Sequence, residues 1–493
     1  MDWVLLGAGR WCSSILVLTA LVLVATAVLR RYFSAISDVP GPFWASITRL
    51  WHIYYIYNGD HNTRVMELHE KHGHFVRIAP NEVSISHPDG PDLLLQKPLR
   101  KGDWYRVFTI PDYTYATPQS TLDPKEKMER SRMFAPGFTL SYLLRSEAHF
   151  DVNMTHLFDW MDKYAKTHEP THLDKFFSYV TFDNAGDAIF SRSFGFTKAG
   201  QDIGGSIANS RSLNCYMAIA GYHVWIHRLF VANPIITWSG LLPMGHLFKT
   251  SMEALRQRKK DPDARFDIVA HWLKAHHERP DLLSYRDVEA QTTTSIAAAS
   301  DTLSCALQSF VYFMMKHPNV WQRAKNETKT AISLGRLRDR IVSYRDSRKL
   351  PYLEACVYES LRMFGPTPFQ LSRVAPKGGI NIGSMYFPEG TVLSINPQVL
   401  QKSDDCWGPD ANEFRPERWL PNGFQKKYRH WLVFGMGYNR CPGEHLAEIQ
   451  IFKIAATIVR DYTIRAVDPL SEWKWKAYFT TVPHSWPVYI ERK

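Results

Sequence analysis

The sequence predicts a mostly helical fold with small β-sheets, preceded by one N-terminal transmembrane helix. The stretch Trp11–Leu29 is predominantly apolar and uncharged over a length that spans a bilayer as one helix. Residues 75–90 alternate apolar and polar side chains, which predicts a β-hairpin. From Asp92 to about Leu247 the pattern is mostly helical, broken at prolines and glycine-containing loops. Two further strands are expected at Gly379–Ile382 and Thr391–Ile395.

Composition narrows the class of protein. The chain has 493 residues, of which 45% are hydrophobic and 22% charged, so a large core is expected and disorder is not. The net charge of +11 predicts an acidic partner or membrane phosphate. No run of Lys and Arg with interleaved aromatics appears, so nucleic-acid binding is not expected. The six cysteines show no paired spacing and are expected to be reduced thiols on the cytosolic side.

The apolar stretch is interpreted as a retained membrane anchor. Arg30 and Arg31 follow it directly, which favours a cytosolic location for the rest of the chain. A cleaved signal peptide is the alternative, because Ala25-Thr26-Ala27 resembles a cleavage site, but the apolar run is long for one. We therefore expect an anchor over residues 1–31, a proline-containing hinge over 32–45 and a single domain over 46–493.

The stretch Phe434–Gly443 reads Phe-Gly-Met-Gly-Tyr-Asn-Arg-Cys-Pro-Gly, and we expect the rest of the chain to be organised around it. Gly435 and Gly437 allow the backbone to fold tightly against a large flat group. Cys441 precedes an apolar pattern at helical spacing, with Pro442 as the expected first helical residue. A cysteine at a helix N-terminus has a stabilised thiolate, which suits a haem iron. A buried structural cysteine is the alternative.

This stretch resembles the Phe-x-x-Gly-x-x-x-Cys-x-Gly loop of the cytochrome P-450 superfamily, whose four defining positions are here Phe434, Gly437, Cys441 and Gly443. The resemblance implies that these four positions bind haem b and that Cys441 is the axial ligand of its iron. The chain looks most similar to fungal microsomal members near the pisatin demethylase and benzoate hydroxylase groups. It departs from the family at Asn439, where arginine is common, and at Glu444, where a basic residue is common.

A long helix is expected over Gln291–Lys316, and its first half consists mostly of small and hydroxyl residues. Such a helix lets another group pack against its backbone, and an acid beside a hydroxyl can relay protons into a dry site. The segment Ala298–Thr302 resembles the family's Ala-Gly-x-Asp/Glu-Thr element over the distal haem face, with alanine in place of the glycine. The resemblance implies that Asp301 and Thr302 are catalytic and that Ala298 lines the substrate pocket.

Another helix is expected over Tyr352–Phe364, ended by Gly365-Pro366. Glu359 and Arg362 lie three residues apart and share a face, where an exposed pair contributes only about 0.2–0.5 kcal/mol. The resemblance implies a larger contribution to stability than that of an exposed pair. In the family, the Glu-x-x-Arg pair joins the arginine of a later Pro-Glu-Arg motif, which is here Arg418. Such a cluster would fix the scaffold of the cysteine loop and take no part in the chemistry.

The resemblance also implies which basic residues bind the haem propionates. Arg373 occupies a position where many members hold a propionate. The helix expected over Lys125–Phe138 looks like the one that contributes cations to a propionate, here through Lys127 or Arg132. A solvated, charged helix face is the alternative interpretation of this segment.

Taken over the whole chain, the resemblance implies a monooxygenase that oxidises a lipophilic small molecule, in a tailoring step of fungal secondary metabolism. Electrons would come from NADPH through an NADPH-cytochrome P-450 reductase, with cytochrome b5 as a second donor. The enzyme would be a monomer of the endoplasmic reticulum membrane, single-pass, with a cytosolic catalytic domain. A haem-thiolate isomerase or dehydratase that uses no reductase, and a non-catalytic membrane-anchored haem binder, are the alternatives. Further pocket residues are expected before Lys125 and at Pro366–Leu371 and Phe479–Thr481.

Overall fold

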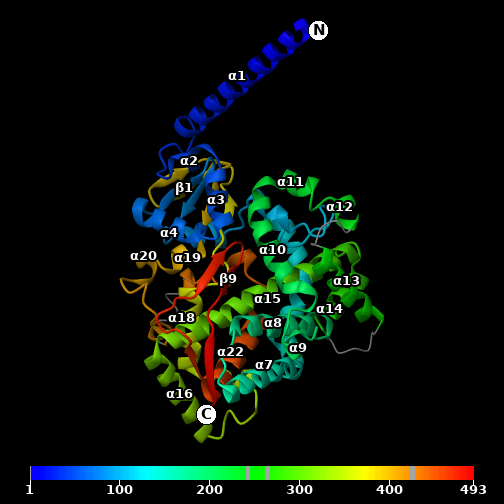
Figure 1. The fold of residues 1–493 in the computed structure, drawn as a ribbon, viewed down its shortest axis with the longest axis vertical. Coiled ribbons are helices and arrows are strands. Elements are labelled where there is room, and N and C mark those ends of the chain that lie inside the picture. Colours follow the sequence, from blue (N-terminus) through cyan, green and yellow to red (C-terminus); the bar gives the residue numbers. More distant parts are fainter. Residues whose placement is uncertain (1, 240–244, 261–266, 421–427, 493) are drawn as a thin grey trace.

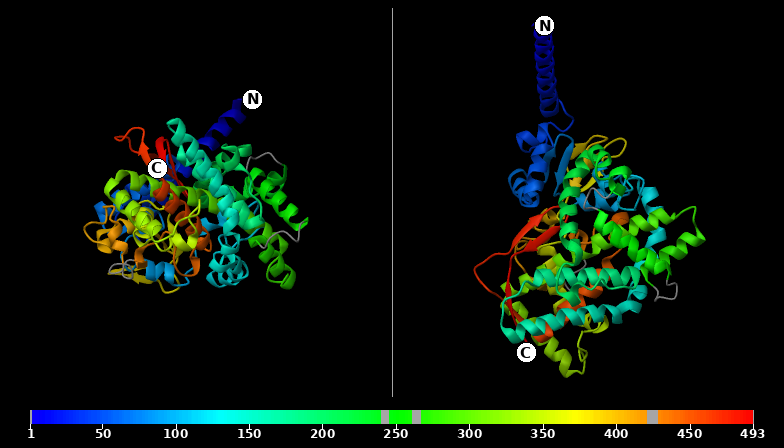
Figure 2. Two further views of the ribbon diagram at one scale, coloured as in Figure 1. Left: turned by 90° about the horizontal axis from the view of Figure 1, so that it is seen from below. Right: turned by 45° about the vertical axis from the view of Figure 1, so that its right-hand side comes forward.

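The computed structural model describes residues 2–239, 245–260, 267–420 and 428–492. It confirms the predicted class, mostly helices with small sheets. Helix α1 (Asp2–Tyr32) projects from the body of the molecule, and the C-terminus lies at the opposite end of that body (Figure 1). The projecting helix is seen again in the turned views of Figure 2, where helices make up most of the body.

Helices occupy most of the described chain. Those of the N-terminal third are α2 (Phe43–Ile47), α3 (Leu50–Asn58), α4 (His61–His72), α5 (Pro124–Phe134), α6 (Leu140–Leu143) and α7 (Glu147–Thr167). The middle of the chain forms α8 (Leu173–Phe190), α9 (Phe196–Ala199), α10 (Ser206–Ala220), α11 (Val224–Leu229), α12 (Pro234–Ser239), α13 (Gly245–Lys260) and α14 (Ile268–Glu278). The remaining helices are α15 (Tyr285–Lys316), α16 (Pro318–Ser333), α17 (Tyr344–Ser347), α18 (Pro351–Met363), α19 (Pro397–Gln401), α20 (Asp404–Trp407) and α22 (Glu444–Asp461). The predicted helical region up to Leu247 includes residues 240–244, which lie outside the described residues.

Within α1, the segment Ser14–Tyr32 is long and apolar enough to cross a membrane, with a mean hydropathy of 1.9 and none of it buried. It fits a single-pass anchor. The end of the helix is fixed to the body of the protein: Arg30 Nη1 donates to the Ile47 carbonyl over 3.0 Å, and Arg77 Nη2 donates to the Arg30 carbonyl over 2.7 Å.

The largest sheet has four strands in the order β1-β2-β6-β3. The predicted hairpin is confirmed as β1 (Phe75–Ala79) and β2 (Glu82–Ile85), paired antiparallel. Strand β2 runs parallel to β6 (Val392–Ile395), which pairs antiparallel with β3 (Leu371–Val374). The two-stranded sheets join β4 (Ile380–Ile382) to β5 (Met385–Phe387), β7 (Tyr462–Ala466) to β10 (Val488–Arg492), and β8 (Lys474–Ala477) to β9 (Thr481–His484). Both predicted later strands are therefore present, as β4 and β6.

Helix α15 forms the centre of the fold, where it packs against α8, α13, α18 and α22. The main hydrophobic core surrounds it and includes Phe310 of α15, Phe177 of α8 and Leu353 of α18. The helix begins at Tyr285, earlier than the predicted Gln291, because Ser284 and Asp287 form a capping box.

The helices that carry the Glu-x-x-Arg pair and follow the cysteine loop begin or end close to the predicted residues. Helix α18 spans Pro351–Met363, one residue from the predicted range at each end. Helix α22 begins at Glu444, so Pro442 as first helical residue was wrong. The Gly443 carbonyl accepts the first helical bond, from Ala447 N over 2.9 Å, and the preceding residues form a turn.

Candidate functional site

The loop that presents Cys441 is closed by its own backbone. The Cys441 N–H donates to the Phe434 carbonyl over 2.8 Å. Gly435 and Gly437 both have positive φ, at +69° and +60°. A Cβ on Gly437 would lie 2.4 Å from the carbonyl oxygen of Leu95, so glycine is required there by close approach as well as by conformation. The loop therefore has one shape, set by local sequence.

The Cys441 side chain is exposed. Gly443 lies next to it, and a Cβ added to this glycine would be 3.8 Å from Cys441 Sγ. Surrounding protein nevertheless desolvates the thiol and raises its pKa to about 11, while the Gly443 N–H acts to lower that pKa and the Glu444 carboxylate to raise it. Stabilisation of the thiolate by backbone N–H groups stays a prediction, and the Gly443 N–H acts in that direction. A coordinating metal deprotonates a thiol outright, so the group remains suited to be a ligand.

Glu444, one of the two departures from the family pattern, pairs with the arginine beside the cysteine. Arg440 donates to both carboxylate oxygens of Glu444, from Nε over 2.6 Å and from Nη2 over 2.8 Å. The acid at position 444 thus neutralises the arginine next to the cysteine. Other cations must hold any anion that binds against this loop.

Three cations lie close together, and two of them contact Tyr438 of the cysteine loop. Arg373 of β3 is 2% exposed and lies 5.8 Å from the Tyr438 ring centroid, and Lys127 of α5 is 8% exposed and lies 5.5 Å from it. Lys127 Nζ also donates to the Tyr438 carbonyl. Lys101, the third cation, is 1% exposed and donates to the carbonyls of Pro118 and Gln119. None of the three is paired with a carboxylate of the described residues.

Lys101 is a residue that sequence reasoning missed. It forms an isolated antiparallel bridge with Arg373, so the two side chains are brought together at the edge of the main sheet. The next residue, Gly102, lies so close to β3 that a Cβ would be 2.4 Å from Ser372 Oγ. The glycine is the one local signal for this approach, and it does not identify the partner.

Mutual repulsion and burial weaken the proton affinity of both lysines. Burial, Arg373 and Lys127 lower the pKa of Lys101 to about 6, and burial and Arg373 lower the pKa of Lys127 to about 8. The cluster is therefore short of negative charge. Arg132, which lies further along α5 than Lys127, is exposed and has no contact with this cluster among the described residues.

The acid and the alcohol of α15 lie in different surroundings. Thr302 is half-buried and its Oγ1 donates to the Ala298 carbonyl over 2.6 Å, which places both on one face of the helix. Ala298 is exposed although its helix runs through the centre of the fold. Asp301 is buried and bonded to Ser210 and Asn214 of α10. The face with Ala298 and Thr302 is thus open to another molecule, whereas the Asp301 side chain is turned towards α10.

Aromatic rings from three segments that were expected to line a substrate pocket meet in the structure. Trp104 lies 4.4 Å from Phe369 and 5.5 Å from Phe479, measured between ring centroids, and Phe108 lies 5.1 Å from Phe479. Tyr105, next to Trp104, also contacts Lys101, with Nζ 4.9 Å from the ring centroid. The aromatic cluster therefore adjoins the cation cluster.

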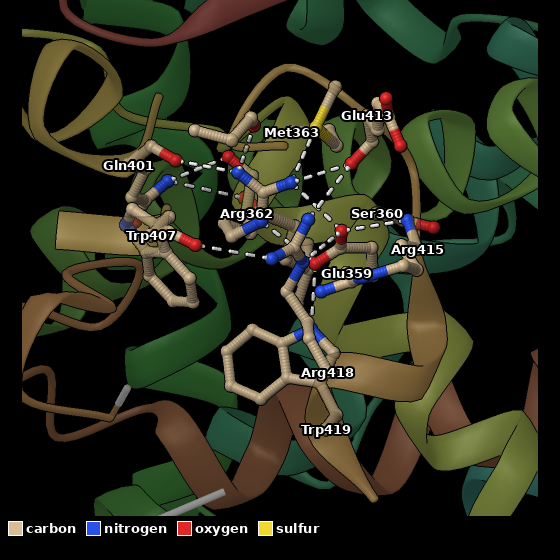
Figure 3. A network of polar contacts seen from close by, with 12 residues as sticks. Glu359, Ser360, Arg362, Met363, Gln401, Trp407, Glu413, Arg415, Arg418 and Trp419 are labelled. Atoms are coloured by element: carbon tan, nitrogen blue, oxygen red, sulfur yellow. Dashed lines mark hydrogen bonds and ion pairs between the residues drawn. The ribbon is translucent and has the colours of Figure 1, made fainter. Parts of the chain in front are cut away.

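The Glu359 carboxylate is the hub of a fully buried network (Figure 3). It accepts hydrogen bonds of 2.8 Å from Arg362 Nε, Arg418 Nε and Trp419 Nε1, and one of 2.9 Å from Arg415 N. The guanidinium groups also bind carbonyls, those of Gln401, Ala411 and Glu413 for Arg362 and that of Asp410 for Arg418. This network connects α18 to the segment that leads into the cysteine loop.

The donor set fits the haem that the resemblance implies. Cys441 presents an accessible sulfur, and haem iron accepts a cysteine thiolate. The three cations beside the same loop lack an anion, and Arg373 Nε is buried without a partner among the described residues. Two carboxylates, such as the propionates of haem, would supply what the cluster lacks.

Comparison with known proteins agrees with this fit. A profile of the family described as Cytochrome P450 matches residues 40–484. The cytochrome P450 monooxygenase gsfF of Penicillium aethiopicum is 29% identical over 93% of the chain and 94% of its own length. The cytochrome P450 monooxygenase pkfB of Emericella nidulans is 28% identical over 93% of the chain and 92% of its own length. The cytochrome P450 monooxygenase mpaDE of Penicillium roqueforti is 29% identical over 91% of the chain but only 54% of its own length.

Proposed function

The chain belongs to the cytochrome P450 family and is a cytochrome P450 monooxygenase, and from this premise we propose that it oxidises a lipophilic small molecule with O2 and electrons derived from NADPH. Membership implies a haem-thiolate centre. The assignments of single residues that follow are part of the proposal.

Cys441 is the axial ligand of haem b, with Phe434, Gly437 and Gly443 shaping the loop that carries it. Arg373, Lys127 and Lys101 bind the propionates. The observation that carries this assignment is the cluster of three buried cations, because no carboxylate of the described residues balances them and two of them, Lys127 and Arg373, contact the cysteine loop. When bound, the haem activates O2 and supplies the oxidising chemistry.

The chain's own residues prepare the distal side. Thr302 keeps its hydroxyl on the exposed face of α15, with Ala298 one turn earlier as the surface against which substrate lies. Asp301 holds or releases a proton at its carboxylate oxygens and passes it towards Thr302. Glu359, Arg362 and Arg418 do no chemistry and fix the scaffold of the cysteine loop.

The aromatic cluster supports a lipophilic substrate. Trp104, Phe108, Phe369 and Phe479 offer ring faces and edges, which favour a flat, apolar molecule over a polar one. The similar proteins are fungal monooxygenases, which supports a tailoring step of secondary metabolism as the setting. The site and type of oxidation then depend on the pose of the substrate.

The setting in the cell follows from the anchor and the charge. Residues 1–31 anchor the protein in the endoplasmic reticulum membrane, residues 32–45 form the hinge and residues 46–493 form one cytosolic catalytic domain. A net charge of +11 favours an acidic docking face on an NADPH-cytochrome P450 reductase, with cytochrome b5 as a second donor. The protein acts as a monomer.

The test uses microsomes that contain the full chain, with and without a fungal NADPH-cytochrome P450 reductase. We expect a strongly red-shifted Soret band with carbon monoxide after reduction by dithionite, and the same band after reduction by NADPH when the reductase is present. Cys441→Ala should lose it. A band with dithionite alone would overturn the monooxygenase assignment in favour of an isomerase or dehydratase. No thiolate band in the wild-type protein would overturn the haem site.

A further inference from the structure

Helix α10 holds the carboxylate of Asp301, which lies next to Thr302 on α15. Ser210 Oγ donates to Asp301 Oδ2 over 2.8 Å, and Asn214 Nδ2 donates to the same oxygen over 2.7 Å. Ser210 and Asn214 lie four residues apart and therefore share one face of α10. All three side chains are buried. Neither contact joins Oδ1 to a described residue, so that oxygen is left for another partner.

A cavity of about 10 Å³, about the size of one water sphere, adjoins this carboxylate. Its walls are polar on several sides and consist of Ser178, Arg211, Asp301, Ser304, Cys305, Gln308 and residues 481–483. A buried water needs two to four polar partners. The hydroxyl, amide, guanidinium and carboxylate groups here meet that requirement.

Arg211, on the same helix as the two donors, connects the cavity to the surface. It is partly exposed, and its Nε is buried without a partner among the described residues. Its charge acts to lower the pKa of Asp301 on the inner side and of Asp174 on the outer side. Asp174 in turn lies 3.7 Å from the exposed ring of His172. Charged and hydrogen-bonding groups thus lead from solvent to the cavity.

The balance at Asp301 suits a group that exchanges protons. Burial raises the pKa of its carboxyl above the ordinary value, whereas Ser210, Arg211 and Asn214 act in the opposite direction. Cys305, which lines the same cavity, is a buried thiol whose pKa is raised by burial and by Asp301, so it stays neutral. The two α10 donors therefore decide how readily Asp301 ionises.

We propose that Ser210 and Asn214 are positioning residues for Asp301, and that water in the cavity beside Arg211 delivers protons to its carboxylate. The inference rests on the proposed monooxygenase function. Asp301 Oδ1 takes a proton from the cavity water, the hydroxide left behind is reprotonated from bulk solvent past Arg211, and Asp301 passes the proton towards Thr302. Helix α10 thus supplies both the geometry and the proton route.

The first measurement is the protonation state of Asp301 across a pH series. It is detected in infrared difference spectra recorded when carbon monoxide is photolysed from the reduced holoenzyme. The protonated carboxyl band is assigned by its absence in Asp301→Asn. Each donor forms a charge-assisted hydrogen bond, so Ser210→Ala and Asn214→Ala should each raise the midpoint of this band by roughly one to two pH units. Ser210→Thr, which keeps the hydroxyl, should restore the wild-type midpoint.

The matched control is Ser212→Ala on the same helix. Ser212 is exposed and its hydroxyl donates to the Ala208 carbonyl of its own helix, so the same chemical change there should leave the midpoint unchanged. An unchanged midpoint in both Ser210→Ala and Asn214→Ala would overturn the positioning role. A shift in Ser212→Ala as large as theirs would also overturn it, because the effect would then belong to α10 in general.

The second measurement tests the water route. Cys305→Leu fills the cavity without removing a charged group, and Cys305→Val replaces it if the larger side chain prevents holoenzyme formation. We expect a larger share of NADPH electrons in hydrogen peroxide and a larger solvent deuterium isotope effect on oxygen uptake with NADPH and reductase. Wild-type values in a variant that retains the thiolate band would place the proton route elsewhere. Loss of the NADPH-dependent band in wild-type protein would instead refute the proposed function, so the two failures are distinguishable.

Discussion

Both clusters of buried cations precede the cysteine loop in the sequence, and they differ in how their charges are balanced. Around Glu359, two guanidinium groups meet one carboxylate and several carbonyls, and the network is complete within the protein. Around Tyr438, Lys101, Lys127 and Arg373 meet no carboxylate of the described residues. The first cluster is satisfied by the chain, whereas the second needs an anion from outside it.

The difference separates scaffold from binding site. Buried charges are tolerated when paired and hydrogen-bonded, so the Glu359 network is expected to stabilise the fold once formed. An unpaired cluster of buried cations lowers the free energy of unfolding of the haem-free protein. Binding of an anion to the cluster raises that free energy again. Substitutions in the two clusters should therefore change the stability of the haem-free protein in opposite directions.

The largest effect is expected at Arg418. Arg418→Ala leaves the Glu359 carboxylate with one guanidinium partner in a buried site, so the free energy of unfolding should fall by about 3–5 kcal/mol and haem should be lost with the fold. Urea unfolding and haem content measure both. Arg415→Ala is the matched control, because that side chain is about half exposed and forms an ion pair with Asp410, while its backbone N–H to Glu359 is kept.

The control should change stability by no more than about 1 kcal/mol, as for other exposed ion pairs. If Arg418→Ala were as stable as Arg415→Ala, the network would be a dispensable feature and the contrast between the clusters would fail.

The second effect is expected at Arg373 and has the opposite sign in the haem-free protein. Arg373→Met removes a buried cation from beside two lysines, so the haem-free protein should become more stable while the bound haem is held less tightly. Loss of a hydrogen-bonded charge pair predicts roughly 10–100-fold faster haem transfer to apomyoglobin. Greater haem loss together with lower haem-free stability would mean that Arg373 belongs to the scaffold.

The parts of the site that could be predicted are those in which one short segment carries the whole signal. Gly435, Gly437 and Cys441 form a turn whose shape depends on their own backbone, and Ala298 and Thr302 share a face because of helical periodicity alone. The earlier start of α15 was readable too, since Ser284 and Asp287 have capping-box spacing, although it was missed.

Other parts were not readable because tertiary contacts set them. Lys101 stands in a basic Arg-Lys-Gly sequence typical of a surface, and it is buried only because the chain pairs there with Arg373, far along the sequence. In the same way, Asp301 is oriented by Ser210 and Asn214 of another helix. Neither partner leaves a trace in the local sequence.

The third effect is a pH dependence of stability that is larger in the haem-free protein than in the holoenzyme. The pKa of Lys101 is about 6 in the folded chain, well below its value of about 10 when unfolded, so the unfolded state binds more protons between these values. The free energy of unfolding should therefore rise with pH between about 6 and 10, with the destabilisation fully present below pH 6. Bound propionates raise the pKa of Lys101, so the holoenzyme should show a smaller slope.

The matched variant for this measurement is Lys101→Met, which keeps the length of the side chain and removes the charge. Its haem-free form should be more stable than wild type at pH 6 and should show a flatter pH profile. If the free energy of unfolding had the same pH dependence in the wild-type and variant proteins, the lowered pKa of Lys101 would be contradicted.

The smallest effect is expected at Arg132, and it decides which cation of α5 belongs to the site. Lys127 is buried against Tyr438, whereas Arg132 is exposed, so the face of α5 that meets the cysteine loop carries the lysine and not the arginine. Arg132→Ala should change stability by less than about 0.5 kcal/mol and leave the rate of haem transfer unaltered. Lys127→Ala, on the same helix, should accelerate that transfer. The reverse order would mean that Arg132 folds back onto a propionate once haem is bound, and the comparison between a satisfied and an unsatisfied cluster would then have to include the arginine in the second.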